Sequence, residues 1–364
     1  MPATAELDSF RIALDAGRFA HHGGRIAAAR TLFPDAPQRW VDLSTGINRR
    51  SYPAPRATSA QRNRLPEASQ LVELEARAAN TFHVDDPARV VALPGTELAL
   101  RLLPQVLALR EAAVLGPTYS SHADAWTRVG SNTLNVDEPA LQSCLDRSCT
   151  DQSDTDRPLA LTVVNPNNPD GRVLSRERLL DLHERLAHRG GALIVDEAFA
   201  DTDPSISVAD IAGSEEAARL IVLRSFGKFY GLAGVRLGFI VASPAIAGSV
   251  RNLMGEWPIS ADALAAGRAA YGDRPWAERM RVALNRSARR LDTLLGRSGF
   301  QVVGGTSLYR LARAANAQQR FLHLLHASVL TRPFDHDHTL LRFGLPHGRA
   351  EWERLATALG SDHD

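Results

Sequence analysis

The sequence predicts an α/β fold: a large domain built on a mainly parallel, mixed sheet, and a smaller α+β domain at the C-terminus. From about residue 89 to residue 245, short apolar runs alternate with helical patterns, as in a layered parallel sheet. From about residue 246, a long helical region rich in Arg, Ala and Leu precedes short strands that alternate with helices. A chain of 364 residues is long enough for two such domains.

The pattern divides the chain into three parts. We expect residues 1–40 to form an arm that packs on the small domain, residues 41–245 the large domain, and residues 246–364 the small domain. The strands expected in the large domain cover 89–93, 112–115, 133–136, 159–164, 192–195, 220–223 and 237–241. Helices are expected at 69–82 and after residue 95, and residues 48–66, rich in Pro, Arg and Ser, should be irregular. In the small domain we expect strands at 300–303, 307–311 and 339–343 and helices near 317–327 and 349–359.

Composition excludes several classes of protein. The 42 Lys+Arg and 41 Asp+Glu give a net charge of +1, which argues against a nucleic-acid or membrane surface built on bulk charge. Two cysteines five residues apart form neither a disulfide framework nor a zinc spacing, which favours a reducing compartment. The sequence offers no apolar stretch of about 20 residues and no signal-peptide pattern, so we expect a cytoplasmic protein.

Lys228 is the only lysine in the sequence, and the other 41 of the 42 cations are arginine. A GC-rich codon bias accounts for many arginines. Arginine cannot replace lysine where a side chain must lose its proton, because its pKa is above about 12. The single lysine is therefore a candidate for amine chemistry such as Schiff-base formation, and its neighbours must decide.

Four polar motifs follow predicted strands, where ligands of open α/β sheets bind. They are Pro94-Gly95-Thr96-Glu97, Asn165-Pro166-Asn167-Asn168-Pro169-Asp170-Gly171, Val195-Asp196-Glu197-Ala198 and Ser225-Phe226-Gly227-Lys228. Taken singly, each has a plain explanation: a helix N-cap, a turn, a solvated strand end or metal site, and codon usage. The four together, in this order, are far more specific.

The combination N-P-N-N-P-x-G, D-E-A-F and S-F-x-K-x-x-G-L-x-G-x-R-x-G resembles fold-type I pyridoxal-phosphate (PLP) enzymes of the aspartate-aminotransferase superfamily. This resemblance covers nearly the whole chain. It implies the fold of PLP-dependent transferases, PLP as the cofactor of residues 41–245, and a homodimer with sites at the interface.

The resemblance also implies roles for individual residues. Lys228 would bind PLP as a Schiff base and shuttle protons, Asp196 would keep the pyridine nitrogen protonated, and Asn168 would bond the ring 3-oxygen. Backbone N–H groups at the start of a helix and an arginine suit the cofactor phosphate. His122 is favoured over Tyr119 as the ring that covers the pyridine, the alternative being a buried structural histidine. The expected cofactor residues are thus Gly95, Thr96, Tyr119, His122, Asn168, Asp196, Ser225, Lys228 and Arg236, of which Lys228 and Asp196 are catalytic.

Three further segments narrow the reaction. His22-Gly23-Gly24, Trp40-Val41-Asp42-Leu43-Ser44-Thr45-Gly46-Ile47-Asn48 and Arg342-Phe343-Gly344-Leu345-Pro346 resemble the threonine-phosphate decarboxylase family of cobalamin biosynthesis. That family converts L-threonine O-3-phosphate to (R)-1-amino-2-propanol O-2-phosphate and CO₂. Arg342 would grip the substrate carboxylate. The expected substrate residues are His22, Gly23, Gly46, Asn48, Asn168 and Arg342.

Two other functions remain compatible with the sequence. Histidinol-phosphate aminotransferase, or another PLP aminotransferase, shares nearly every cofactor residue, and a PLP-fold regulator without catalysis is a third hypothesis. Relatives carry Tyr where this chain has Phe199, Tyr-Pro where it has Leu65-Pro66, and Pro where it has Arg49. The substrate phosphate has three candidate ligands, Arg25, Arg49 and Arg50. Histidines at 323 and 326 and the segment 335–338 contain ligand types for a metal, but we expect no metal site.

Overall fold

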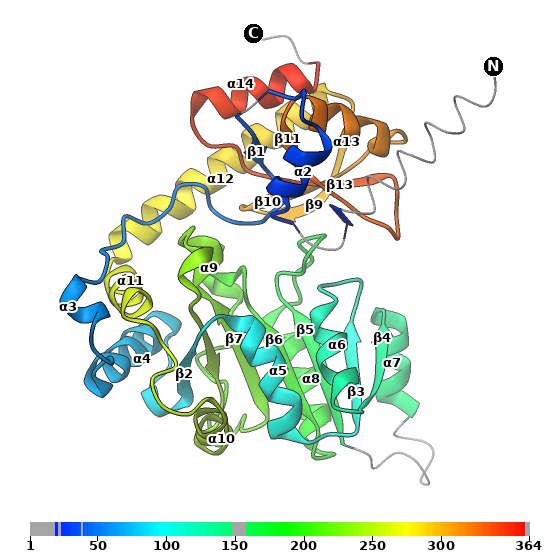
Figure 1. The fold of residues 1–364 in the computed structure, drawn as a ribbon. Coiled ribbons are helices and arrows are strands. Elements are labelled where there is room, and N and C mark those ends of the chain that lie inside the picture. Colours follow the sequence, from blue (N-terminus) through cyan, green and yellow to red (C-terminus); the bar gives the residue numbers. More distant parts are fainter. Residues whose placement is uncertain (1–18, 21–22, 38, 148–157, 361–364) are drawn as a thin grey trace. The chain divides into compact units, whose positions relative to one another are not determined.

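The computed structural model describes residues 19–20, 23–37, 39–147 and 158–360 (Figure 1). It divides into two compact units. The large unit comprises residues 51–168 and 172–278, and the small unit lies within residues 1–50, 169–171 and 279–364. The domain boundaries expected from sequence, at residues 40 and 245, stay a prediction.

The large unit is built on a seven-stranded sheet in the order β2-β8-β7-β6-β5-β3-β4. Its strands are β2 (Val90–Leu93), β3 (Glu111–Leu115), β4 (Asn132–Val136), β5 (Leu159–Val164), β6 (Ala192–Asp196), β7 (Leu220–Ser225) and β8 (Gly238–Val241). Neighbours from β4 to β7 pair in parallel, whereas β8 runs antiparallel to both β7 and β2. All seven strands match the ranges expected from sequence, and the predicted mainly parallel mixed sheet is confirmed. Because the central strands are buried on both faces, they appear in the sequence as apolar runs.

The order of the strands reverses between β3 and β5. The chain passes from β3 outward to β4, returns to place β5 on the other side of β3, and then continues through β6 and β7. The loops after β3 and β5 therefore lead in opposite directions, and open α/β sheets bind ligands at such a reversal of strand order. This topology places the candidate site.

Helices pack on the sheet through apolar side chains. The helices of the large unit are α3 (Ser59–Arg62), α4 (Ala68–Phe82), α5 (Thr96–Leu107), α6 (Ser121–Arg128), α7 (Glu138–Arg147), α8 (Arg176–Ala187), α9 (Phe226–Phe229), α10 (Pro244–Met254) and α11 (Ala261–Tyr271). Helices α5, α6 and α10 share one core with the sheet, in which Leu103, Trp126 and Val250 join Ile194 and Ile240. The side chains between the sheet and these helices are buried, and burial of this apolar surface is the main contribution to the stability of the large unit.

Local sequence decides where these helices begin and end. Ser175 starts α8 by accepting a hydrogen bond from the backbone N–H of Arg178 at 3.2 Å. The single helical region expected from residue 246 to 295 consists instead of α10, α11 and α12 (Arg274–Arg297). The interruption follows from Gly255, whose φ of +71° ends α10, and from a second break at Gly272.

The small unit holds an antiparallel sheet in the order β12-β13-β10-β9 and a parallel pair β1-β11. Its strands are β1 (Val41–Asp42), β9 (Gln301–Thr306), β10 (Tyr309–Arg313), β11 (Val329–Leu330), β12 (Arg332–Pro333) and β13 (Leu340–Gly344). Its helices are α2 (Ile26–Leu32), the C-terminal part of α12, α13 (Ala317–His326) and α14 (Gly348–Ala358).

N-terminal residues pack against the C-terminal part of the small unit. Phe19 meets Phe321 edge to face at 5.7 Å between ring centroids, and Phe33 meets His326 at 4.9 Å. The pairing of β1 with β11 was not predicted, because strands of two residues are too short to show a period. Among the described helices, none combines the length and the hydropathy needed to cross a bilayer.

Candidate active site

The nine expected cofactor residues all lie in the large unit, at one edge of its sheet. Because β8 runs antiparallel to β2 and β7, its beginning lies at the edge where they end. Gly95 and Thr96 follow β2, Tyr119 and His122 follow β3, and Asn168 follows β5; Asp196 ends β6, Ser225 ends β7, Lys228 lies in α9, and Arg236 precedes β8. This edge includes the reversal of strand order between β3 and β5, so the sequence motifs lie along the edge where the topology favours a ligand.

Gly95 and Arg236 form an anion cradle at the start of α5. Gly95 has φ +92°, and a Cβ placed on it would lie 2.6 Å from Nη2 of Arg236, so only glycine lets the guanidinium lie this close. Gly238 allows a second close approach, since its Cβ would lie 2.7 Å from the backbone N of Thr96. The first N–H groups of a helix lack partners within it. Together with the guanidinium, they suit a phosphate group.

Asp196 is held from two sides. Its Oδ1 accepts a hydrogen bond from the backbone N–H of Ala198 at 3.0 Å, and its Oδ2 lies 3.0 Å from Nε2 of His122. Asp196 and His122 are 6% and 2% exposed. A buried carboxylate fixed in this way can hold a proton on a ring nitrogen opposite it.

The contacts of His122 differ from those expected for a ring that covers a cofactor. Its imidazole is buried and its Nε2 is directed at Asp196, which leaves little of its face open. Tyr119 is half-buried and meets His122 edge to face at 6.1 Å. Its hydroxyl lies 3.3 Å from Oε2 of Glu97, and burial, then the Glu97 charge, raise the pKa of Tyr119. This geometry favours Tyr119 as the covering ring and His122 as the support of Asp196.

Lys228 lies in the one-turn helix α9 and is half-buried. Its Nζ lies 5.8 Å from the ring centroid of Phe199, the residue at which relatives have a tyrosine. The neighbouring Phe226, Phe229 and Tyr230 are buried in an aromatic cluster that includes stacked rings of Phe226 and Tyr230 at 4.9 Å. The backbone that carries the amine is therefore anchored by packing.

The asparagine-rich loop after β5 serves two purposes. Asn165 is fully buried and closes the loop, because its Oδ1 accepts from the N–H of Leu174 at 2.8 Å and its Nδ2 donates to the Leu174 carbonyl at 3.2 Å. Asn167 donates from Nδ2 to the carbonyl of Pro117 at 3.0 Å. These two side chains hold the half-buried Asn168 beside the loop that follows β3.

The small unit contains most of the residues expected for the substrate, whereas Asn168, which is expected to contact both cofactor and substrate, lies in the large unit. Arg342 in β13 is 3% exposed and donates from Nη2 to the carbonyl of Ser44 at 2.7 Å. Its guanidinium lies over the Tyr309 ring, 5.0 Å from the centroid. Burial, followed by the nearby Arg332 charge, lowers the pKa of Arg342 to about 9.

Arg332 is the residue that sequence reasoning missed. It lies directly opposite Arg342 in the β12–β13 pairing and is half-buried. The available signal was an arginine in a short segment between the apolar residues Leu330 and Phe334; Arg342, by contrast, was identified from the family resemblance. The pairing places two guanidinium groups side by side in one sheet, and guanidinium groups bind carboxylates and phosphates well, so Arg332 joins Arg342 as a candidate for an anionic group of the substrate.

The remaining substrate candidates gather around Ser44. Gly23 packs so close that a Cβ would lie 2.5 Å from the Ser44 carbonyl oxygen, and Gly24 donates from its N–H to Ser44 Oγ at 2.7 Å. Gly46 is buried, and Asn48 accepts through Oδ1 from the N–H of Arg50 at 2.9 Å. His22 lies outside the described residues.

Arg49 is removed from the candidates for the substrate phosphate. Its Nε donates to Oε2 of Glu351 at 2.8 Å, its Nη2 bonds the other oxygen of the same carboxylate, and its Nη1 donates to the Asp42 carbonyl at 3.0 Å. Within the described part of the chain, no three His, Cys, Asp or Glu side chains gather as metal ligands would.

Comparisons with known proteins agree on the family. The sequence profile of the family described as aminotransferase class I and II matches residues 39–361. A threonine-phosphate decarboxylase of Sinorhizobium sp is 37% identical over 342 residues, covering 93% of this chain and 97% of the relative. A histidinol-phosphate aminotransferase of Rhodospirillum centenum is 31% identical over 330 residues, covering 85% and 88%. The solved structure of histidinol-phosphate aminotransferase from Clostridium acetobutylicum matches with a TM-score of 0.72 and 19% identity, covering 87% of this chain and 97% of that one.

Proposed function

The chain belongs to the aminotransferase class I and II family, and from that premise we propose that it is a PLP-dependent decarboxylase of L-threonine O-3-phosphate. The products are (R)-1-amino-2-propanol O-2-phosphate and CO₂. The observation that carries the proposal is the pairing of Arg332 with Arg342, which suits a substrate with two anionic groups, on a chain that is 37% identical to a threonine-phosphate decarboxylase.

The residues of the large unit fit PLP by their chemistry. The crowded Gly95–Arg236 cradle suits the cofactor phosphate, and the buried Asp196 suits a protonated ring nitrogen. Lys228 supplies the only lysine amine of the sequence. Bound PLP supplies an electron sink for the pair released when the bond between Cα and the carboxylate breaks.

The chain's own residues orient the reactants and move protons. Nζ of Lys228 would hold PLP covalently, and its free amine would be the group that returns a proton to Cα after CO₂ has left. His122 holds Asp196 in place through Oδ2, and Asp196 would keep the proton on the ring nitrogen of bound PLP. Tyr119 would cover the ring, and Asn168 would donate to its 3-oxygen.

The small unit binds the substrate anions. Arg342 would receive the carboxylate and Arg332 the phosphate, and the segment around Ser44, with Gly23, Gly46 and Asn48, would contribute further contacts. The bond that breaks would be the one held perpendicular to the cofactor ring, so the orientation in which the arginines hold the substrate would decide between loss of the carboxylate and loss of the Cα proton.

The test is product analysis. Purified protein loaded with PLP is given L-threonine O-3-phosphate, and CO₂ and the aminopropanol phosphate are measured. A parallel reaction supplies histidinol phosphate with 2-oxoglutarate, because a relative at 31% identity carries that name. Transamination of histidinol phosphate without CO₂ from threonine phosphate would replace this proposal by the aminotransferase alternative.

We also propose a pathway, a compartment and an oligomeric state. We place the activity in cobalamin biosynthesis and in the cytoplasm, where phosphorylated metabolites are used, and we propose a homodimer. The dimer is supported by exposed apolar side chains of the large unit: Leu65 is 63% and Trp257 53% exposed, beside an apolar cavity of about 370 Å³. Contiguous exposed apolar surface marks protein interfaces.

A further inference from the structure

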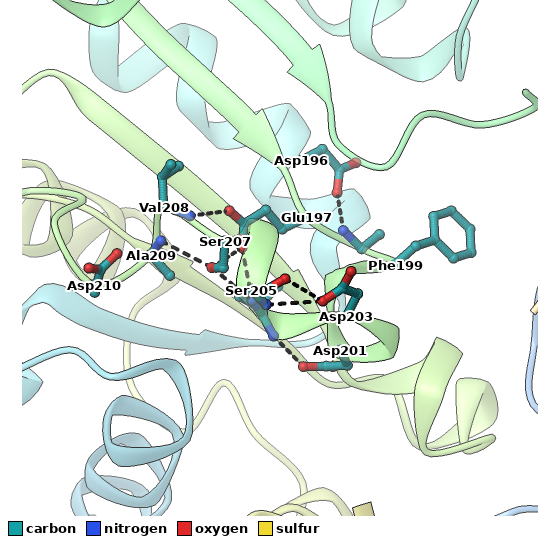
Figure 2. A network of polar contacts seen from close by, with 12 residues as sticks. Asp196, Glu197, Phe199, Asp201, Asp203, Ser205, Ser207, Val208, Ala209 and Asp210 are labelled. Carbon is teal, nitrogen blue, oxygen red and sulfur yellow. Dashed lines mark hydrogen bonds and ion pairs between the residues drawn. The ribbon is translucent and has the colours of Figure 1, made fainter. Parts of the chain in front are cut away.

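A buried ion cluster lies beyond the ends of β6 and β7. Arg224 in β7 donates from Nη1 to Oε2 of Glu197 at 2.8 Å and to Oγ of Ser207 at 3.2 Å, and its Nη2 bonds Oδ1 of Asp201. Figure 2 shows Glu197, Asp201 and Ser207 converging. Glu197 also accepts from the N–H of Val208 at 2.8 Å. The three charged side chains are each less than 5% exposed.

Such a cluster needs a reason beyond stability. Removing charges from water costs free energy that ion pairing often only offsets, and apolar replacements of similar volume are frequently as stable. Desolvation raises the pKa of Glu197, while the Arg224 charge opposes this rise. An arginine that bridges two carboxylates does, however, fix the geometry between them, because its planar fork bonds in defined directions.

The cluster joins two segments that carry candidate site residues. Glu197 follows Asp196, and Arg224 precedes Ser225, the last residue before α9 with Lys228. The parallel pairing of β6 and β7 ends at Asp196 and Leu223, and the N–H of Glu197 donates to the Leu223 carbonyl at 2.9 Å. The ion pair of Glu197 and Arg224 thus extends the connection between the strands beyond the last backbone bond.

The second ion pair closes a short loop. Asp201 lies four residues after Glu197, so Arg224 binds both ends of the segment 197–201, and Phe199 is its central residue. The Phe199 ring is the aromatic group 5.8 Å from Nζ of Lys228, within the range of a cation–π contact.

We propose that Arg224 is a positioning residue: by binding Glu197 and Asp201, it holds the Phe199 ring against the Lys228 amine. This inference rests on the proposed function only in taking Lys228 as the residue that binds PLP. The ring favours the protonated form of the nitrogen it faces, so the position of the loop sets the proton affinity at Lys228.

The test measures the pH midpoint at which the visible absorbance of Lys228-bound PLP changes. Asp201→Asn weakens the ion pair between Arg224 and residue 201, and Phe199→Leu removes the aromatic ring. Each is expected to lower the midpoint by about half a pH unit, the size of a cation–π contact. If Asp201 acts through Phe199, the pH midpoint of the double variant is shifted no further than that of either single variant. The matched control is Glu75→Gln, which weakens the 3.1 Å ion pair between the buried Glu75 and the partly exposed Arg251 elsewhere in the large unit.

Additive shifts, or a wild-type midpoint in Asp201→Asn, overturn the inference. Hydrogen exchange of the cofactor-free protein gives a second readout: amides of 199–203 are expected to exchange at least tenfold faster in Asp201→Asn and unchanged in Glu75→Gln. Unchanged exchange of the 199–203 amides in Asp201→Asn would show that the ion pair of Arg224 with Asp201 does not hold this loop. This result can be obtained even where the variant binds PLP poorly. Failure of the proposed function is separate, since wild type would then release no CO₂ from threonine phosphate while the midpoint shifts remain.

Discussion

Nε2 of His122 and Oδ2 of Asp196 lie 3.0 Å apart, with both side chains almost fully buried. A carboxylate that must face a ring nitrogen needs its other oxygen fixed, and the imidazole does this from α6. The contact links the segment after β3 to the end of β6 across the intervening β5. It therefore connects two segments of the sheet edge at which the cofactor is proposed to bind.

His122→Phe separates the two roles of this side chain. The variant keeps an aromatic ring but loses the hydrogen bond to a charged group, which contributes about 1.5–3 kcal/mol. We expect the PLP dissociation constant, measured by fluorescence titration, to rise at least tenfold. Tyr119→Phe, which keeps its ring and loses its hydroxyl contacts, including the one to Glu97, is the control and should change affinity little. Unchanged affinity in His122→Phe would favour the stacking role.

Gly95→Ala tests the anion cradle. The new Cβ would lie 2.6 Å from Arg236, so the guanidinium must move away from the phosphate position. Gly130→Ala is a close control, because Gly130 has φ +84° but no atom within 4 Å of the added carbon. Both variants should lose about 1 kcal/mol of stability from the positive φ. Only Gly95→Ala should also weaken PLP binding, by about tenfold; equal binding in the two variants would exclude the cradle.

The fold was largely predictable because its signals are local. The strands of the large sheet are buried on both faces, so each appears as an apolar run, and the motifs that follow them are polar. The helical region after residue 246 was less predictable, since the pattern does not show that Gly255 adopts φ +71° and ends a helix. The two-residue strands β1, β11 and β12 carry no periodic signal at all.

The residues of the candidate site could be predicted from the sequence, but most of the contacts that they make could not. Spacing along the chain brought His122 and Asn168 to the same sheet edge, yet it does not show which way an imidazole points. The pairing of Arg224 with Glu197 and Asp201 joins segments 27 and 23 residues apart. From the sequence, Glu197 is interpreted only as part of a solvated strand end or a metal site, because its partner Arg224 lies on another strand.

The proposed homodimer is tested through Leu65 and Trp257. Replacing both with serine is expected to shift the protein toward monomer at micromolar concentration, measured by sedimentation velocity, because two large side chains leave the interface. Val282→Ser removes an apolar side chain of similar exposure, 62%, from α12 in the small unit. A dimer that persists in the double variant, or one that Val282→Ser disrupts equally, would place the interface elsewhere.

Arg332→Gln should weaken substrate binding while it stabilises the protein. The substitution removes the side chain that is proposed to bind the substrate phosphate, so KM for threonine phosphate is expected to rise at least tenfold with a smaller change in kcat. It also removes a like charge opposite Arg342, which costs roughly 0.2–1 kcal/mol across a strand pair. Tm should therefore rise by about 1–3 °C. Arg313→Gln, in the neighbouring β10 and paired with Asp337 at 3.1 Å, is the control.

The pH dependence of this gain follows from the pKa of Arg342, which burial and the Arg332 charge lower to about 9. Below that pH both guanidinium groups are charged in the folded state, and the repulsion is fully present. Above it Arg342 loses its charge, so the repulsion disappears and with it the advantage of Arg332→Gln. The difference in Tm between variant and wild type, followed from pH 7 to pH 10, should shrink as pH passes about 9. A difference that stays constant would show that the two arginines do not interact through their charges.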